Sequence, residues 1–583
     1  MPASRAAAAP PNIVLILADD LGFSDTAPYG SEIPTPHISR LAAEGIRFSN
    51  YHTAASCAPT RGMLLTGVDS HRNGVPNIPE SIPPYQAEQP HYRGTLNHDV
   101  VTIATLLADA GYHTYMTGKW HLGMDPDLLP SKRGFERTVA LADTGADNWE
   151  MKPYLPIYEK ANWFADGREL DELPADFYSS KFFIDKTIEF IESNRADDRP
   201  FFSYIPFQAV HIPVQAPQEH TDKYMGVYDP GWTRLREQRL ERAKLLGIVP
   251  PATRLARVTT TQDWDALADE EKRYASKRMA VYAGMIDAMD HQIGRLIDYL
   301  EKIGEYENTV FLFVSDNGAE GSDPTYGTGG GLFRLWLWSN DYSTDYETLG
   351  TRGSFMNIGP SFASAAAAPL AYYKFFASEG GMRVPLIIAG SAVASKGGIS
   401  NAFSYVTDIA PAILEIAGVT PPSGEYAGRP VEVIIGKSLY ALVTGSTDSV
   451  HPADEPIGYE LGGNAALFKG DYKIVKDRGP IGDDEWHLFD IVSDPGESRD
   501  LRDAEPERFS AMLDDYRSYA ENNRVLPVRD GYDQRTQVGI NALQDRIGRG
   551  FILGAAVFVV LLAAWVWRRV HYRLRKRGAP ASA

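Results

Sequence analysis

Residues 12–22 have the sequence N-I-V-L-I-L-A-D-D-L-G, and this stretch decides the fold class. Its first seven residues form a short apolar run, which Asp19 and Asp20 follow directly. A continuous run of this length is typical of a strand buried on both faces of a parallel sheet. Ligands of open α/β sheets bind beyond the carboxyl ends of the strands, so the two carboxylates lie where a site is expected. An acidic turn that caps the next element is the alternative interpretation.

A second apolar run, T-V-F-L-F-V at residues 309–314, also ends in polar residues, among them Asp316 and Asn317. If the two strands are neighbours, these side chains meet Asp19 and Asp20 at one edge of the sheet. Oxygen ligands of this kind suit a hard cation, so the sequence predicts a site for a cation such as calcium or magnesium.

Further strands and helices alternate along the chain. Strands are predicted at 46–53, 113–117, 200–207 and 384–389, and helices at 35–44, 101–110, 177–194, 265–303 and 407–417. This alternation predicts an α/β fold with a large, mixed and mainly parallel sheet flanked by helices. Residues 219–264 are charged and irregular and are predicted to run over the surface, whereas residues 321–369 show no clear period.

The last part of the globular region predicts a smaller α+β domain that contains an antiparallel sheet. Residues 459–476 alternate like a hairpin, 486–490 add a strand and 506–522 form a closing helix. The predicted organisation is an N-terminal segment 1–10, a main domain 11–436, a C-terminal subdomain 437–523, a polar linker 524–549, one transmembrane helix 550–567 and a basic cytoplasmic tail 568–583.

The transmembrane prediction rests on residues 551–567, which carry no charge and with Gly550 reach about the minimum length of a spanning helix. A buried core helix is the alternative. The positive-inside rule places the basic tail in the cytoplasm and the main domain on the extracytoplasmic or periplasmic side. Residues 1–10 are rich in alanine and proline, like the end of a signal peptide, but no apolar region precedes them.

The bulk composition narrows the class of partner. The 583-residue chain has a formal net charge of −19, which argues against a general nucleic-acid binder. Its apolar content of 44% is ordinary for a globular protein with sizeable cores. A single cysteine excludes a disulfide framework within the chain, so cysteine usage says nothing about the redox compartment.

That cysteine lies in S-C-A-P-T-R-G, residues 56–62. Pro59 suits the first turn of a helix, so Cys57 is predicted near a helix N-terminus, where unpaired N–H groups favour anions. Arg61 lies one turn further on and can reach the same place. Taken alone, a small buried thiol is the commoner role of a free cysteine.

Other candidate residues follow predicted strands or short glycine-containing motifs. Lys119 and His121 lie in G-K-W-H-L-G, His211 follows the strand at 200–207, and Lys374 precedes E-G-G-M-R. Lys119 and His121 alternate, so they share one face of an extended chain. Each of these residues, taken singly, is more often a surface, loop or core residue.

Taken together, these motifs resemble the formylglycine-dependent sulfatases of the alkaline phosphatase superfamily. C-A-P-T-R-G matches the family signature C-x-P-x-R, and G-K-W-H-L-G matches a second signature. The resemblance also runs through the two acidic strand ends, E-G-G-M-R-V-P and W-H-L-F-D-I-V-S-D-P-G-E. It covers about residues 11–524, and A-P-L-A-Y-Y-K is most similar to the bacterial arylsulfatase branch.

The resemblance implies a role for each candidate residue. A maturase would convert Cys57 to formylglycine, whose hydrate attacks sulfur as the nucleophile. The implied metal ligands are Asp19, Asp20, Cys57 in its converted form, Asp316 and Asn317. Arg61 would hold the formylglycine, Lys119 and Lys374 would bind sulfate oxygens, His121 would act as the base for elimination and His211 would protonate the leaving alcohol.

The expected activity is hydrolysis of aryl or alkyl sulfate esters, with a small molecule or a glycan as substrate. Residues 321–369 are the candidate for part of the substrate-binding wall. A phosphonate monoester hydrolase or phosphodiesterase of the same superfamily is one alternative, because a phosphoryl group fits the same kind of site. An inactive, membrane-tethered binding protein is an alternative of another class.

Overall fold

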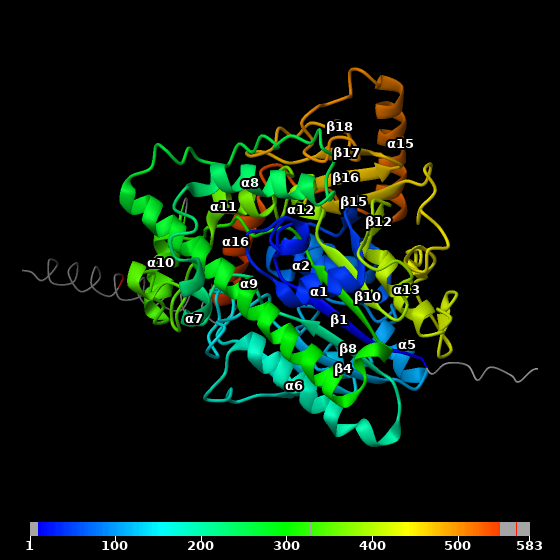
Figure 1. The fold of residues 1–583 in the computed structure, drawn as a ribbon. Helices are drawn as coiled ribbons and strands as arrows, with labels where there is room; N and C mark the ends of the chain where they lie inside the picture. Colours follow the sequence, from blue (N-terminus) through cyan, green and yellow to red (C-terminus); the bar gives the residue numbers. More distant parts are fainter. Residues whose placement is uncertain (1–9, 327–328, 548–566, 568–583) are drawn as a thin grey trace, which may run out of the picture.

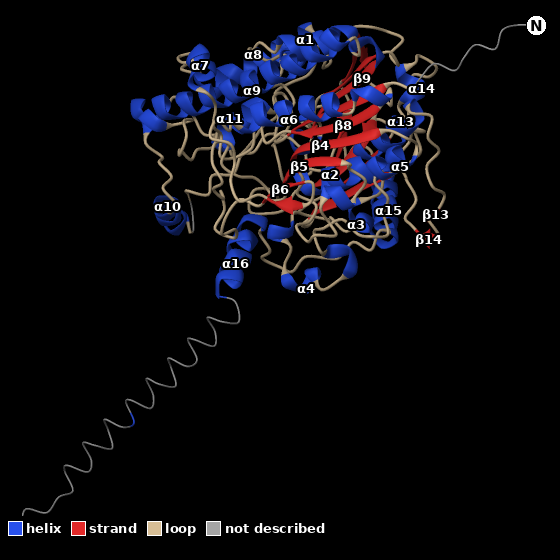
Figure 2. Ribbon diagram, turned by 90° about the horizontal axis from the view of Figure 1, so that it is seen from below, coloured by secondary structure: helices blue, strands red, loops and turns tan. Residues whose placement is uncertain are grey.

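The computed structural model describes residues 10–326, 329–547 and 567. Its centre is one ten-stranded sheet (Figures 1 and 2). The strands lie in the order β11 (Gly398–Ser400), β2 (Gly45–Phe48), β10 (Leu386–Gly390), β9 (Thr309–Ser315), β1 (Asn12–Ala18), β8 (Phe201–Pro206), β4 (His113–Lys119), β5 (Arg137–Leu141), β6 (Trp163–Ala165) and β7 (Arg168–Glu169). The five strands from β9 to β5 run parallel, whereas β10, β6 and β7 are antiparallel to their neighbours. The prediction of a mixed, mainly parallel sheet is confirmed.

The strand β1 is buried on both faces, as its unbroken apolar sequence predicts. Val14 and Ile16 pack into one hydrophobic core, whereas Ile13 and Leu15 pack into another. This division follows from the period of two in a strand, which sends successive side chains to opposite faces. The sheet therefore has a core on each side.

Helices cover both faces, and Figure 2 shows the sheet between the two layers. The first layer contains α1 (Pro36–Glu44), α6 (Ser179–Ser193), α8 (Gly231–Leu245), α9 (Asp269–Ile303) and α11 (Gly359–Ala366). The second layer contains α2 (Cys57–Thr66), α5 (Ile103–Asp109), α13 (Ile409–Ile416) and α14 (Tyr440–Val443). The remaining helices are α3 (Ser70–Asn73), α4 (Pro84–Ala87), α7 (Gln218–Thr221), α10 (Gly330–Ser339), α12 (Glu379–Met382), α15 (Pro506–Asn522) and α16 (Gln534–Ile547).

The C-terminal part forms a second, four-stranded antiparallel sheet, as predicted. Its strands are β15 (Ile457–Leu461), β16 (Asn464–Lys469), β17 (Tyr472–Lys476) and β18 (His487–Asp490), and α15 packs beside them (Figure 1). The predicted hairpin over 459–476 is in fact three strands. Two-stranded pairs complete the strand set: β3 (Tyr51–His52) with β12 (Ser404–Tyr405), and β13 (Glu425–Tyr426) with β14 (Arg429–Pro430).

A buried charged cluster joins the four-stranded sheet to α12 and to β3. Lys473 Nζ on β17 donates to Glu379 Oε1 at 2.9 Å, and Glu379 also pairs with His52 at 3.0 Å. Because breaking a buried pair leaves an uncompensated charge, these contacts fix the position of β17 against α12 and β3. The domain boundaries proposed from the sequence stay predictions.

The sequence prediction that residues 219–264 are irregular and run over the surface was wrong. Residues 219–264 contain α8, whose Trp232 and Leu235 lie in the core, and the buried Arg239 pairs with Asp25 at 2.6 Å. The apolar residues of α8 are interspersed with long charged side chains, which conceal the buried face in the sequence. Residues 321–369 contain α10 and α11, and the predicted polar linker 524–549 contains α16.

Among the described residues, no helix is long and apolar enough to cross a bilayer. The predicted span 550–567 lies outside the described residues apart from Trp567, as do residues 1–9 and the tail 568–583.

Candidate active site

The two acidic strand ends meet, as the sequence predicts. The strands β1 and β9 are neighbours, with Ala18 opposite Ser315. The Asp20 N–H donates to Asp316 Oδ1 at 3.1 Å, and Asn317 Nδ2 donates to Asp20 Oδ1 at 2.8 Å. All four oxygen-bearing side chains, those of Asp19, Asp20, Asp316 and Asn317, are fully buried.

Cys57 is the first residue of α2 and is buried beside this cluster. Its Sγ lies within 4.8 Å of a carboxylate oxygen of Asp19 and of one of Asp316. The helix N-terminus carries free N–H groups and a positive partial charge, which favour an anionic group at this position. A nucleophile formed at Cys57 would therefore lie next to the acidic cluster and at the positive end of α2.

Arg61, one turn along α2, fixes this arrangement through a two-pronged ion pair. Its Nε and Nη2 donate to Asp316 Oδ2 at 3.0 and 2.7 Å, and its Nη1 donates to the Lys119 carbonyl at 2.7 Å. The planar guanidinium group of Arg61 donates its hydrogen bonds in a fixed geometry that a lysine ammonium group cannot reproduce. Burial by itself would raise the pKa of Asp316, but the charges of Arg61 and Lys119 outweigh it and lower that pKa.

Two lysines complete the charged part of the site. Lys119 Nζ, at the end of β4, donates to Asp19 Oδ2 at 2.6 Å. Lys374 Nζ lies 2.8 Å from Asp20 Oδ1 and 3.1 Å from Glu320 Oε2. Gly118, just before Lys119, has φ 145°, and a Cβ there would lie 1.9 Å from the Pro206 carbonyl oxygen. Only glycine therefore allows β4 to end this close to β8.

The two predicted histidines border the same centre. His211 Nδ1 donates to the Ile212 carbonyl at 2.6 Å, which leaves Nε2 facing Asp20 Oδ2 at 3.6 Å. His121 has φ 56°, and its Nε2 lies 3.2 Å from Glu80 Oε2. A non-glycine residue held in the left-handed region is a feature of functional sites. Burial lowers the pKa of both rings, most strongly that of His211, where Lys119 and Lys374 add to the effect.

The residues present fit a divalent cation. Within the described part of the chain, Asp19 Oδ1 and Asn317 Oδ1 are buried without a hydrogen-bond partner. Buried acceptors of this kind are rare unless an ion or water satisfies them. Asp19, Asp20 and His211 also place one ligand atom each within 4.8 Å of one another. Burial is the main cause that raises the pKa of Asp20 to about 6, and the negative charges of Glu320 and Asp316 add to it although Lys374 opposes them.

The structure thus brings together all ten residues predicted from the sequence. It also adds three that the sequence did not indicate. Glu80 pairs with His121, Glu320 pairs with Lys374, and the Tyr154 ring packs edge-on against His211 with centroids 5.1 Å apart. None of the three belongs to a motif; Glu320 follows Asn317 by three residues, whereas Glu80 and Tyr154 are brought to the site by long-range packing.

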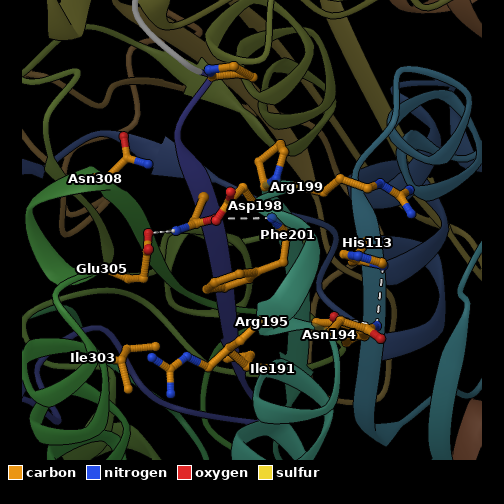
Figure 3. A pocket seen from close by; sticks show the side chains of 14 residues that line it. His113, Ile191, Asn194, Arg195, Asp198, Arg199, Phe201, Ile303, Glu305 and Asn308 are labelled. Atoms are coloured by element: carbon orange, nitrogen blue, oxygen red, sulfur yellow. Dashed lines mark hydrogen bonds between the residues drawn. The ribbon is translucent and has the colours of Figure 1, made fainter.

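A separate pocket lies at the opposite, amino-terminal edge of the parallel strands (Figure 3). Its volume is about 300 Å³, and its polar groups are largely paired with one another. Asn12 Nδ2 donates to Glu305 Oε2 at 2.9 Å, and His113 lies between Glu136 and Asp197 at 2.7 and 3.0 Å. Its described lining residues include no cysteine, serine or lysine, whereas the residues predicted to act in catalysis lie at the other edge.

Comparison with known proteins agrees with this geometry. A model of the Sulfatase family matches residues 11–419. An uncharacterized sulfatase of Schizosaccharomyces pombe is 39% identical over 90% of this chain and 95% of its own length. The arylsulfatase of Klebsiella aerogenes is 35% identical over 74% of this chain and 92% of its own length.

Solved structures support the fold. The crystal structure of Ps i-CgsB in complex with k-i-k-neocarrahexaose has a TM-score of 0.63 at 22% identity and covers 93% of this chain and 98% of its own. A structure in complex with D-glucosamine-2-N,6-O-disulfate has a TM-score of 0.58 at 21% identity and covers 88% of this chain and 98% of its own. The family match over most of the chain, together with the arylsulfatase relatives, shows that this protein belongs to the sulfatase family and is a sulfuric ester hydrolase of the alkaline phosphatase superfamily.

Proposed function

We propose that this sulfatase hydrolyses aryl, alkyl or carbohydrate sulfate esters with Cys57 converted to formylglycine. The observation that carries the proposal is the position of Cys57 at the start of α2, within 4.8 Å of Asp19 and Asp316 oxygens. A formylglycine hydrate supplies one hydroxyl to attack sulfur and a second whose deprotonation expels sulfate, which a serine or a thiol cannot do. A maturase that acts on the segment around Cys57 is the partner that this proposal requires.

Asp19, Asp20, Asp316, Asn317 and the converted Cys57 are the proposed ligands of one divalent cation. Their oxygens favour calcium, with magnesium as the alternative. Such a cation supplies positive charge that lowers the pKa of a nearby hydroxyl and neutralises a sulfate oxygen.

The chain's own residues divide the remaining work. Arg61 orients the nucleophile, since it is already fixed by Asp316 and the Lys119 carbonyl. Lys119 and Lys374 now pair with Asp19 and Asp20. Once another positive charge balances these two carboxylates, both lysines can bind sulfate oxygens. His211 protonates the leaving alcohol through Nε2, the nitrogen that its Nδ1–Ile212 bond leaves available. His121 accepts the proton that elimination releases.

The substrate wall is assigned to the segment that carries α10. Trp336 and Leu337 of α10 pack with Ile212 and Tyr154, immediately beside His211. An aromatic cluster next to the leaving-group acid suits a site for a ring-shaped alcohol, either a phenol or a sugar. The named carbohydrate ligands of two structural neighbours are consistent with the sugar alternative.

A direct comparison of substrates tests the reaction class. Purified protein co-expressed with a maturase should turn over 4-nitrophenyl sulfate or a sulfated sugar with a larger kcat/KM than a phenyl phosphonate monoester. A larger kcat/KM on phosphorus would make the phosphonate hydrolase the better assignment. Mass spectrometry should find the Cys57 peptide about 18 Da lighter than the cysteine form, because hydrogen sulfide is lost and oxygen gained. Native protein with unconverted Cys57 and no turnover would instead favour the binding protein.

We also propose that residues 550–567 anchor the protein in a membrane, with the catalytic domain on the extracytoplasmic side. The sequence supports this through an uncharged segment followed by a basic tail. Membrane fractions of the native host should retain the full chain after a carbonate wash, and protease added outside should reach the catalytic domain. Release by carbonate, or protection of that domain, would refute the proposed topology.

A further inference from the structure

The imidazole of His121 uses only one of its two nitrogens in contacts within the described structure. Its Nε2 lies 3.2 Å from Glu80 Oε2, whereas its Nδ1 is buried and has no hydrogen-bond partner among the described residues. The side chains of both residues are about 2% exposed, so water does not weaken this pair. Glu80 is therefore in a position to decide which nitrogen of His121 carries the proton.

The chemistry of the Glu80–His121 pair determines which ring nitrogen of His121 carries the proton. A carboxylate only accepts hydrogen bonds, so the nitrogen that faces Glu80 must carry the hydrogen. In the neutral ring, Nδ1 is then the unprotonated nitrogen and the one able to accept a proton. We propose that Glu80 is a positioning residue that holds His121 in the tautomer and orientation needed for its role as a base. This inference rests on the proposed function, because it assigns a partner to the base in that mechanism.

Glu80 is itself held from several directions. The Tyr158 hydroxyl donates to Glu80 Oε1, so the second carboxylate oxygen is also engaged. The backbone of the turn is fixed by the C-terminal segment, because Asn541 Nδ2 of α16 donates to the Glu80 and Ile82 carbonyls at 2.8 and 2.9 Å. The Tyr532 hydroxyl donates to the Ser81 carbonyl at 3.0 Å. A surface carboxylate that merely happened to approach the ring would lack this support.

The charges around His121 explain why a carboxylate is needed there. Burial lowers the pKa of His121, Lys119 and Arg61 lower it further, and Glu80 opposes them. Asp143, whose pKa burial raises to about 7, lies in the field of both Glu80 and His121. Burial alone would raise the pKa of Glu80 as well, but His121 and Tyr158 outweigh it and keep the group ionised. Without Glu80, Lys119 and Arg61 would lower the pKa of His121 further, and Asp143 would be the carboxyl group left in its field.

The decisive experiment is a double-mutant cycle in the membrane-anchored, maturase-treated protein. Glu80→Gln should lower kcat on 4-nitrophenyl sulfate by about 10- to 100-fold and change KM by less than about threefold, as expected for partners that orient a site residue. In a His121→Asn background, Glu80→Gln should have almost no further effect, because residues that act as a unit are not additive. The acid limb of the kcat profile should move to lower pH, since removal of the carboxylate lowers the pKa of the base.

A matched control is Glu136→Gln, which removes the carboxylate partner of His113 at the other edge of the sheet and should leave kcat unchanged. Mass spectrometry of Cys57 and the melting temperature separate a maturation or folding defect from a catalytic one. If the folded and converted Glu80→Gln protein has an unchanged kcat, the positioning role is refuted. It is also refuted if Glu80→Gln lowers kcat by the same factor in the His121→Asn background as in the wild-type protein. Absence of sulfate-ester turnover in converted wild-type protein would overturn the proposed function together with this inference.

Discussion

Gly145 provides a direct test of His211 as the leaving-group acid, because the space beside the His211 ring is too small for a side chain at position 145. A Cβ at this position would lie 2.9 Å from His211 Nδ1 and 3.2 Å from Tyr154 Cε1. Ordinary contacts begin near 3.5 Å, so Gly145→Ala must push the ring by about 0.6 Å. The ring cannot yield freely, because Nδ1 is bound to the Ile212 carbonyl and Tyr154 packs against it edge-on.

The size of the effect follows from that displacement. A misplacement of about 1 Å in an active site costs about 100-fold in rate, so about 0.6 Å corresponds to about tenfold. The loss should depend on the leaving group, because 4-nitrophenolate departs without protonation whereas an alkoxide needs the proton of His211. We expect kcat/KM to fall about tenfold for an alkyl or sugar sulfate and by less than about threefold for 4-nitrophenyl sulfate. Overpacking should also lower the free energy of unfolding by about 1–3 kcal/mol.

The assay is a comparison of steady-state kinetics on the two substrates at one pH, with calorimetry to follow stability. Gly398→Ala on β11, at the edge of the main sheet, is the matched control, since a Cβ there meets its nearest atom at an ordinary 3.4 Å, and it should alter the rate on neither substrate. Equal losses on both substrates would show that His211 does not act on the leaving group. An undiminished rate on the alkyl sulfate would refute the steric reasoning itself.

Three further predictions concern other parts of the site. Arg61→Met should cost about 3–5 kcal/mol of unfolding free energy, measured by chemical denaturation, because it removes the positive charge with which buried Asp316 is paired; a loss below about 1 kcal/mol would contradict this. Calcium should raise the melting temperature at pH 7.5 but much less at pH 5, because Asp20, with its pKa raised to about 6, must lose its proton to bind a cation; a pH-independent shift would argue against this ligand. Asn541→Ala should lower kcat several-fold by loosening the turn that carries Glu80, while KM stays nearly constant, and a change confined to KM would count against that coupling.

The sequence predicted the centre of the site because its signals are local. Asp19 and Asp316 each follow an apolar strand, and a parallel sheet brings such strand ends together. Cys57 and Arg61 are one helical turn apart, so their common location follows from helix geometry. Strand order and helix geometry explain each pair, whereas the meeting of Cys57 with the acidic strand ends was expected from the resemblance to the sulfatases.

The parts that the sequence did not predict depend on contacts between distant segments. Glu80 precedes its partner His121 by 41 residues and lies in a short proline-containing turn with no periodic signal. The helix α16 resembled a linker because it attaches mainly through polar groups, such as Asn541 on the Glu80 turn, rather than through an apolar stripe. Hydrogen bonds between elements leave no pattern in composition or periodicity, so these contacts emerge only from the three-dimensional structure.

Charge balance explains why the two lysines can serve the substrate rather than the fold. Asp19 and Asp20 now have Lys119 and Lys374 as counter-ions, whereas Asp316 has Arg61. Buried carboxylates need a counter-charge, but a bound divalent cation satisfies that need as well as two lysines do. Lys119 and Lys374 are then available for the anionic sulfate group, and the site stays close to neutral at each stage. Lys374 also keeps Glu320 at 3.1 Å, so it remains anchored after Asp20 changes partner, whereas in the described structure Lys119 has its ion pair with Asp19 alone.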